Sequence, residues 1–327
     1  MRLVINVKTP TFVLSGDRLY IGLDTIVSNN KLYIIDISRL PINQLLNVRN
    51  IDKQALGVLV NAASKDPGKY SIREYLVLSK CEGTEVLDHS IEGVPPSEIK
   101  GLMRTTYLHW LLTRDSNLRE GFIKLVSERL LEGSRLNALS TDAESHVLAI
   151  LLERVYGERK YDALYQLFKD LIVKQLSRPQ PINYGVYCIH DSSNKFKVMA
   201  IGLRPSVRLE YEVAVRHTLV SDDVKDRLLN YNDLIESIRL FSSDAASFER
   251  SRGLGIPDCG GGIPMRIGFG VGRRWKTVLN VLEKYSPDLV RKVTDYVSNH
   301  LGRPWDDSTI RFVGNEPIGW VCVEVIK

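Results

Sequence analysis

The chain has 327 residues, of which 44% are hydrophobic and 25% charged, and its net charge is +5. This is the composition of a globular protein with one large domain or two ordinary ones. No segment approaches the roughly 20 apolar residues of a membrane span, and the start is polar too early for a secretory signal. We therefore expect a cytoplasmic protein with no membrane partner. Its mild positive charge permits a nucleic-acid partner without requiring one.

The four cysteines are scattered along the chain, at Cys81, Cys188, Cys259 and Cys322. No pair has the spacing of zinc ligands, and a disulfide framework is unusual in a chain of this size. The six histidines also lack the i, i+3 or i, i+4 spacing of a helical metal site. We expect reduced, mostly buried cysteines, and we expect neither a metal site nor a cofactor.

The first half of the chain begins with strands and continues with helices. Short stretches rich in β-branched residues predict strands within residues 1–40, in LVINV, TFVL, DRLYIG and KLYIIDI. Pro95 and Pro96 then stop the chain, and Ser97 is placed to cap the helix that follows. Residues 115–178 have a helical pattern throughout.

The second half returns to strands in VYCIH, KFKVMAIGL and RLEYEVAVR, and a helix is expected from Asp222 to Phe248. A glycine-rich loop with its helix follows, and GWVCVEVI closes the chain as a strand. This order predicts an α+β fold, a ferredoxin-like core of the split β-α-β type interrupted by a helical module. The predicted divisions are 1–114 for the first part of the core, 115–180 for a helical insertion and 181–327 for the second part. Such sheets often bind single-stranded RNA on an open face.

The glycine-rich loop lies in RIGFGVGRRWKTVLN. It fits neither the nucleotide-binding loop, because Trp275 replaces the glycine before the lysine, nor the dinucleotide fingerprint, because G-x-G-x-G is one residue short. Flexible backbone beside three cations at a helix start nevertheless favours phosphate binding over an ordinary turn with solvated charges. The candidate residues are Gly268, Gly270, Gly272, Arg273, Arg274 and Lys276.

A second cationic motif lies in SEIKGLMR, where Lys100 and Arg104 are four residues apart on one helical face. Like charges at this spacing repel by a few tenths of a kcal/mol, and the helix dipole disfavours cations in the first turns. Such an arrangement is easier to understand if an anion binds there. Two solvated cations are the alternative.

Three stretches, TPTFVLSGDRLYIG, VPPSEIKGLMRT and MRIGFGVGRRWKT, resemble in this order the three signatures of RAMP proteins, the RNA-binding subunits of CRISPR effector complexes. The chain is most similar to the fifth subunit of type III Csm complexes. In that family a strand ending in aspartate, here at Asp36, follows the first signature, and a G-W-V strand, here from Gly319, closes the chain. Residues 115–178 and 222–250 carry none of the resemblance.

The sequence departs from the family pattern at two places. IGLD replaces I-G-x-G in the first signature, and GRPWDDSTIRF replaces a basic, proline-containing stretch before the last strand. These departures leave open a related RAMP subunit of a Cmr or type III-D complex.

The resemblance implies an RRM-like sheet and a place in a cytoplasmic ribonucleoprotein of antiviral defence. It implies a subunit that caps the backbone filament near the 3′ end of the guide RNA (crRNA), with target RNA and the other subunits as partners. Carried over by motif, Lys100, Arg104 and the loop 268–276 would hold guide-RNA phosphates.

The filament-forming relatives cut target RNA with a loop aspartate and a divalent ion, and Asp24 is the one candidate near the matching place. It has no second acid nearby, so we expect it to cap a turn. We predict a non-catalytic RNA-binding subunit. The alternatives are a RAMP-type metal-dependent endoribonuclease that uses Asp24, and a nucleotide-binding or purely scaffolding protein.

Several other side chains have an ordinary structural explanation. We expect His190 to end a strand rather than act as a base, and Trp275 to lie in the core. Tyr184 and Tyr187 are three apart and so point oppositely on a regular strand. At most one of them can stack on a base, and Phe269 is a better stacking candidate.

Overall fold

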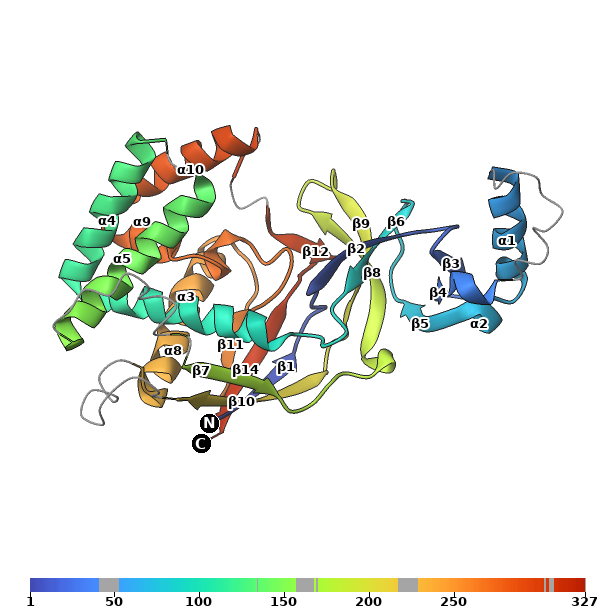
Figure 1. Cartoon of the computed structure of the whole chain (residues 1–327), viewed down its shortest axis with the longest axis horizontal. Coiled ribbons are helices and arrows are strands. Elements are labelled where there is room, and N and C mark those ends of the chain that lie inside the picture. Colours follow the sequence, from blue (N-terminus) through green and yellow to red (C-terminus); the bar gives the residue numbers. More distant parts are fainter. Residues whose placement is uncertain are drawn as a thin grey trace.

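A computed structural model of the chain describes residues 1–40, 53–133, 135–156, 168, 170–216, 229–302, 304–305 and 309–326. It contains two sheets, with a group of helices at one end of the molecule and a smaller helical element at the other (Figure 1). The α+β class predicted from the sequence is confirmed.

The first sheet has five strands, each antiparallel to its neighbours, in the order β11 (Ile263–Arg266), β14 (Trp320–Ile326), β1 (Arg2–Val7), β10 (Arg208–Val215) and β7 (Leu171–Gln175). Leu3 lies opposite both Tyr211 and Val325, so these side chains share one face of the sheet. Helices α3 (Pro96–Arg114) and α8 (Tyr231–Ser251) contribute to the same hydrophobic core, beside the sheet (Figure 1).

The opposite face of this sheet carries positively charged, negatively charged and neutral polar side chains. Arg2 forms an ion pair with Glu210, and Asn6 donates a hydrogen bond to Glu324 over 2.8 Å. None of the described residues in the five strands is an exposed aromatic. The face therefore lacks the rings that RNA-binding sheets use to stack bases.

The second sheet runs in the order β2 (Leu14–Tyr20), β6 (Glu85–His89), β9 (Lys197–Leu203), β8 (Tyr184–Asp191), β5 (Ser71–Val77), β4 (Lys31–Ile35) and β3 (Thr25–Ser28), with β12 (Arg311–Val313) and β13 (Glu316–Pro317) attached at β8. Tyr184 stacks on His89 in one core cluster, whereas Tyr187 packs against Phe12 in another. Their predicted opposition is confirmed. Both rings are buried, so neither is available to a base.

The remaining helices lie at the two ends of the molecule. Helices α4 (Ser116–Leu131), α5 (Leu136–Tyr156), α9 (Leu279–Tyr285) and α10 (Pro287–Leu301) gather at one end, and α1 (Lys53–Lys65) and α2 (Pro67–Tyr70) lie at the other (Figure 1). Asp115 caps α4 by accepting a hydrogen bond from the Leu118 N–H over 3.0 Å. In the described ranges, no helix has both the length and the apolarity that a bilayer crossing requires.

Two sequence expectations about local structure are wrong. Leu171–Gln175 was expected to be helical but forms β7, because Ile172 and Val173 favour a strand and β10 offers a partner. Ser97 does not cap α3; the cap position belongs to Pro95, and no side chain caps the helix. The start of the helix expected at Asp222 lies outside the described residues.

The cysteines are also paired rather than reduced. Cys81 is bonded to Cys188 and Cys259 to Cys322, with Cα atoms 5.3 and 5.5 Å apart. The partners are 107 and 63 residues apart in the sequence, so only the fold brings them together.

Candidate nucleic-acid interface

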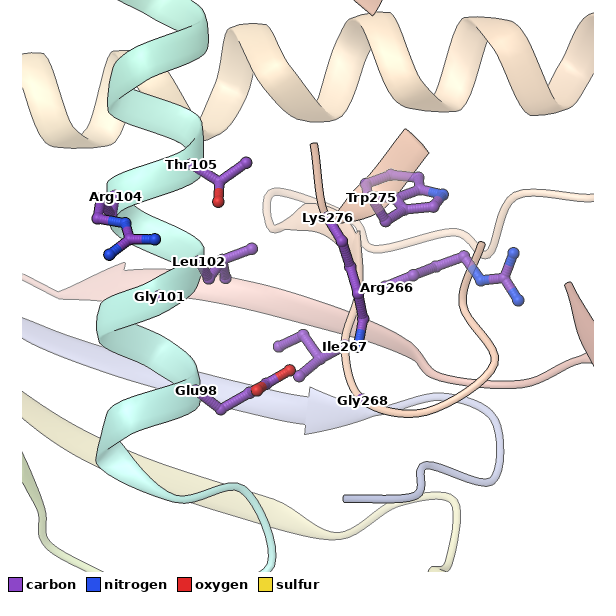
Figure 2. A pocket seen from close by; sticks show the side chains of 10 residues that line it. All are labelled: Glu98, Gly101, Leu102, Arg104, Thr105, Arg266, Ile267, Gly268, Trp275 and Lys276. Carbon is purple, nitrogen blue, oxygen red and sulfur yellow. The ribbon is translucent and has the colours of Figure 1, made fainter. Parts of the chain in front are cut away.

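The two cationic motifs of the sequence meet at one pocket of about 170 Å³ (Figure 2). One wall is formed by the first turns of α3 and the other by the glycine-rich loop. The lining residues are Glu98, Gly101, Leu102, Arg104 and Thr105 from α3, and Arg266, Ile267, Gly268, Trp275 and Lys276 from the loop and its flanks. Segments that are far apart in the sequence therefore lie face to face.

Three cations line this pocket: Arg266, which is fully buried, and the more exposed Arg104 and Lys276. The side chain of Arg104 is 42% exposed, and its Nη2 lies 3.3 Å from Oε2 of Glu144. Burial raises the pKa of Glu144, and the Arg104 guanidinium acts against that rise. Lys276 is exposed, and among the described residues its ammonium has no hydrogen bond or ion pair. Lys276 is thus the cation with the least compensation from the protein.

Lys100, the other cation of the α3 motif, is half-buried and does not line the pocket. Burial lowers the pKa of Lys100, and the nearby carboxylate of Asp170 opposes this. The structure therefore separates Lys100 from Arg104, although the sequence placed them on one helical face.

Arg273 and Arg274 turn away from the pocket. Nη1 of Arg273 donates to Oγ1 of Thr294 over 3.1 Å, and its guanidinium lies over the Trp305 ring. Arg274 is 5% exposed, lies 4.2 Å from the centre of the Phe248 ring and forms an ion pair with Glu283. Both side chains join the loop to neighbouring helices, and their contact with phosphate stays a prediction.

The loop glycines are explained by close packing. Gly268 has φ of +93°, and a Cβ there would collide with the carbonyl oxygen of Phe12, which accepts the Phe269 N–H over 2.6 Å. A Cβ on Gly270 would lie 2.6 Å from Arg311, and one on Gly272 would lie 2.9 Å from Ile310. Of the three, only Gly268 lines the pocket.

The loop also enters a short 3₁₀ turn, Arg273–Trp275, before α9. The loop is therefore not followed directly by the start of an α-helix, and its glycines are required by tight packing. Anion binding by its backbone stays a prediction.

A buried polar network lies under the loop. Nη1 of Arg266 is 2.6 Å from Oε1 of Glu249, and the same oxygen accepts the Trp275 indole N–H over 2.7 Å. Arg266 also donates twice to the carbonyl of Ile318. Burial lowers the pKa of Arg266, and the Glu249 carboxylate counteracts this. The network fixes the floor of the pocket, and the predicted core position of Trp275 is confirmed.

Glu98 and Gly101 are pocket residues that sequence reasoning missed. Gly101 is exposed, and an added Cβ would meet no atom within 4 Å. Glycine inside a helix costs about 1 kcal/mol relative to alanine, and no packing requirement accounts for it here. The position of Gly101 inside a predicted helix was a signal in the sequence that this part of α3 lines a pocket.

Asp24 and His190, which were weighed for catalysis, and Asp36, which follows β4, all make local hydrogen bonds. Asp24 accepts a hydrogen bond from the Tyr20 N–H over 2.9 Å, so its predicted turn-capping role is confirmed. Asp36 accepts from Ser38, which lowers its pKa. The ring nitrogens of His190, near the end of β8, lie 2.9 Å from the carbonyl oxygens of Asp191 and Gly314. Within the described residues, no three His, Cys, Asp or Glu side chains are grouped to hold a metal ion.

Comparison with solved structures gives two informative matches. A chain of the Csm–crRNA–target RNA ternary complex of a type III-A CRISPR-Cas system is 19% identical, with a TM-score of 0.62, and the match covers 99% of this chain and 100% of that one. The crystal structure of Csm5 from T. onnurineus is 18% identical, with a TM-score of 0.58 and coverage of 98% and 99%. The protein shares the Csm5 fold. No protein-family model and no curated protein sequence matches.

Proposed function

We propose that this protein is a non-catalytic guide-RNA-binding subunit of a type III CRISPR effector complex, in which it caps the backbone filament. The likeness to Csm5 and to a chain of a Csm–crRNA–target RNA complex extends over nearly the whole length of the protein. Its partners would be the guide RNA, the target RNA and the other subunits, in a cytoplasmic assembly for antiviral defence.

The first sheet supports a ferredoxin-like, RRM-like core. Strands β14, β1, β10 and β7 have the order 4-1-3-2 of that fold, and α3 and α8 occupy the places of its two connecting helices. In this proposal residues 115–180 are a largely helical insertion. Near its end the chain returns to the first sheet through β7. Residues 1–114 and 181–327 supply the rest of the core.

The observation that carries the proposal is the convergence of the two cationic motifs on one pocket. Lys276 points from the loop into a space that is open to solvent, and Arg104 lies at the edge of this space on the flank of α3 (Figure 2). Gly101 has no side chain to fill the space beside the helix. Lysine and arginine side chains that neutralise phosphates provide most of the affinity of proteins for a nucleic acid backbone. The pocket therefore suits one phosphate of an RNA strand.

Salt dependence tests this function. The full chain is titrated against a fluorescent single-stranded RNA at several salt concentrations. Since each phosphate contact contributes about 0.7 to the slope of log K against log salt, Lys276→Ala should reduce that slope by about 0.7. Lys292→Ala, a change of an equally exposed lysine on α10, is the control. Binding that is absent, or that ignores salt, would refute the proposal.

The non-catalytic role is tested separately in the assembled complex. Asp24 is held by the Tyr20 N–H, so its loss should disturb a turn and leave cleavage of target RNA unchanged. If Asp24→Ala abolished a metal-dependent cleavage, the ribonuclease alternative would replace this part of the proposal.

A further inference from the structure

Glu98 gives the pocket a feature that a phosphate site does not need. Its carboxylate lines the pocket together with Arg104 and Lys276 (Figure 2). Among the described residues, neither the carboxylate of Glu98 nor the ammonium of Lys276 has a hydrogen bond or an ion pair. An acid and a base thus face one small space without touching each other.

This arrangement is complementary to a ligand that carries both an anion and a hydrogen-bond donor. A phosphate alone would be attracted by Lys276 and Arg104 but repelled by Glu98. A ribonucleotide supplies both groups, because its 2′-hydroxyl is attached to the carbon next to the one that carries the 3′ phosphate, whatever the base. The 2′-hydroxyl is also the group by which proteins distinguish RNA from DNA.

We propose that Glu98 accepts a hydrogen bond from the 2′-hydroxyl of the nucleotide whose phosphate is bound by Lys276, so that this pocket selects RNA over DNA. The inference rests on the proposed RNA-binding function and specifies which sugar group the site recognises.

The neighbours of Glu98 fit this occupant. Gly101 and Leu102 lie three and four residues after Glu98 and therefore on the same side of α3. Gly101 leaves space beside the carboxylate, and Leu102 and Ile267 offer apolar surface on the two walls to the carbons of a sugar ring. The Lys276 ammonium remains for the phosphate, and the Arg104 guanidinium adds positive charge at the edge of the pocket.

A purely structural role for Glu98 makes a different prediction. A carboxylate in the first turn of α3 also interacts favourably with the helix dipole. Loss of that interaction would lower stability alone and would change RNA and DNA binding equally.

The test uses the full chain, a fluorescein-labelled oligouridylate of about 12 nucleotides and its deoxyuridine counterpart, a length within the usual range for single-strand binding sites. The wild type should bind the RNA about tenfold more tightly than the DNA, as one charge-assisted hydrogen bond allows. Glu98→Ala should weaken RNA binding about tenfold. DNA binding should stay equal or tighten, because a negative charge is removed from beside the phosphate.

Two further variants sharpen the result. Glu98→Gln keeps an acceptor oxygen and should retain part of the preference for RNA. Glu120→Ala, a change of an exposed glutamate on α4, should leave both affinities unchanged.

Each remaining outcome overturns a defined statement. Equal wild-type affinity for the two oligonucleotides would refute sugar selection while leaving RNA binding intact. Sugar selection would also be refuted if Glu98→Ala weakened RNA and DNA binding equally. That result would indicate that Glu98 contacts the base or only stabilises the fold. If the wild type binds neither, the proposed function falls together with this inference.

Discussion

The cations of the glycine-rich segment fall into two groups with opposite environments. Arg266 and Arg274 are buried, and Arg273 is half-buried; all three are held by partners inside the protein. Lys276, two residues after Arg274, is exposed and lines a solvent-open pocket, as does Arg104 from α3. Cations of a single motif therefore differ in environment: those that hold the loop are buried or half-buried, and the one that lines the pocket is exposed.

The largest expected effect comes from the interior group. Glu249→Ala removes the carboxylate that Arg266 and Trp275 share and leaves a guanidinium buried without its counter-charge. We expect a loss of about 3–5 kcal/mol in the free energy of unfolding, measured by urea denaturation. A double replacement, Arg266→Met with Glu249→Leu, should lose much less because no charge stays buried. A loss below about 1 kcal/mol for Glu249→Ala would contradict the view that the buried cations stabilise the loop.

Two glycines provide the next contrast. Gly268→Ala places a Cβ against the Phe12 carbonyl at a positive φ and should cost about 1–3 kcal/mol from backbone strain alone. Gly101→Ala meets no atom within 4 Å and should stabilise the protein by up to about 1 kcal/mol. RNA affinity should nevertheless fall for Gly101→Ala, because the new methyl group enters the pocket. If Gly101→Ala bound RNA as the wild type does, that wall would have no part in binding.

The arginine and lysine at the end of the loop should separate stability from binding. Arg274→Ala loses the contact with Phe248 and the pair with Glu283, so we expect a loss of about 1–3 kcal/mol in the free energy of unfolding. Lys276→Ala should change that free energy by less than about 0.5 kcal/mol and act on the salt slope instead. Urea denaturation and RNA titration of both variants measure these effects. If the two variants changed stability and RNA binding alike, Arg274 and Lys276 would not have separate roles.

Local patterns were enough to predict part of this molecule. The strands in VYCIH, KFKVMAIGL, RLEYEVAVR and GWVCVEVI were predicted where β8, β9, β10 and β14 lie, since alternation and β-branched residues mark them directly. The resemblance implied that the α3 motif and the glycine loop both hold guide-RNA phosphates, and the two segments do line one pocket.

The other features depend on contacts between residues far apart in the sequence, which local patterns do not reveal. The sequence alone indicated no partner for Arg273, but its guanidinium contacts Thr294 and Trp305, more than twenty residues later. Gly268 is required by Phe12, which lies near the other end of the sequence. Such contacts leave no local trace, and neither does the pairing of the cysteines. Lys100 and Arg104 share a helical face in projection but not the same neighbours in space.

The position of β14 has a consequence for how the protein is made. This strand lies between β1 and β11 and pairs with both, although β1 begins at Arg2 and β14 ends at Ile326. While the chain is being synthesised, β1 and β11 each have an unpaired edge that can attract another chain. A partly synthesised chain that lacks β14 therefore cannot close the first sheet, and it is vulnerable to aggregation until β14 pairs.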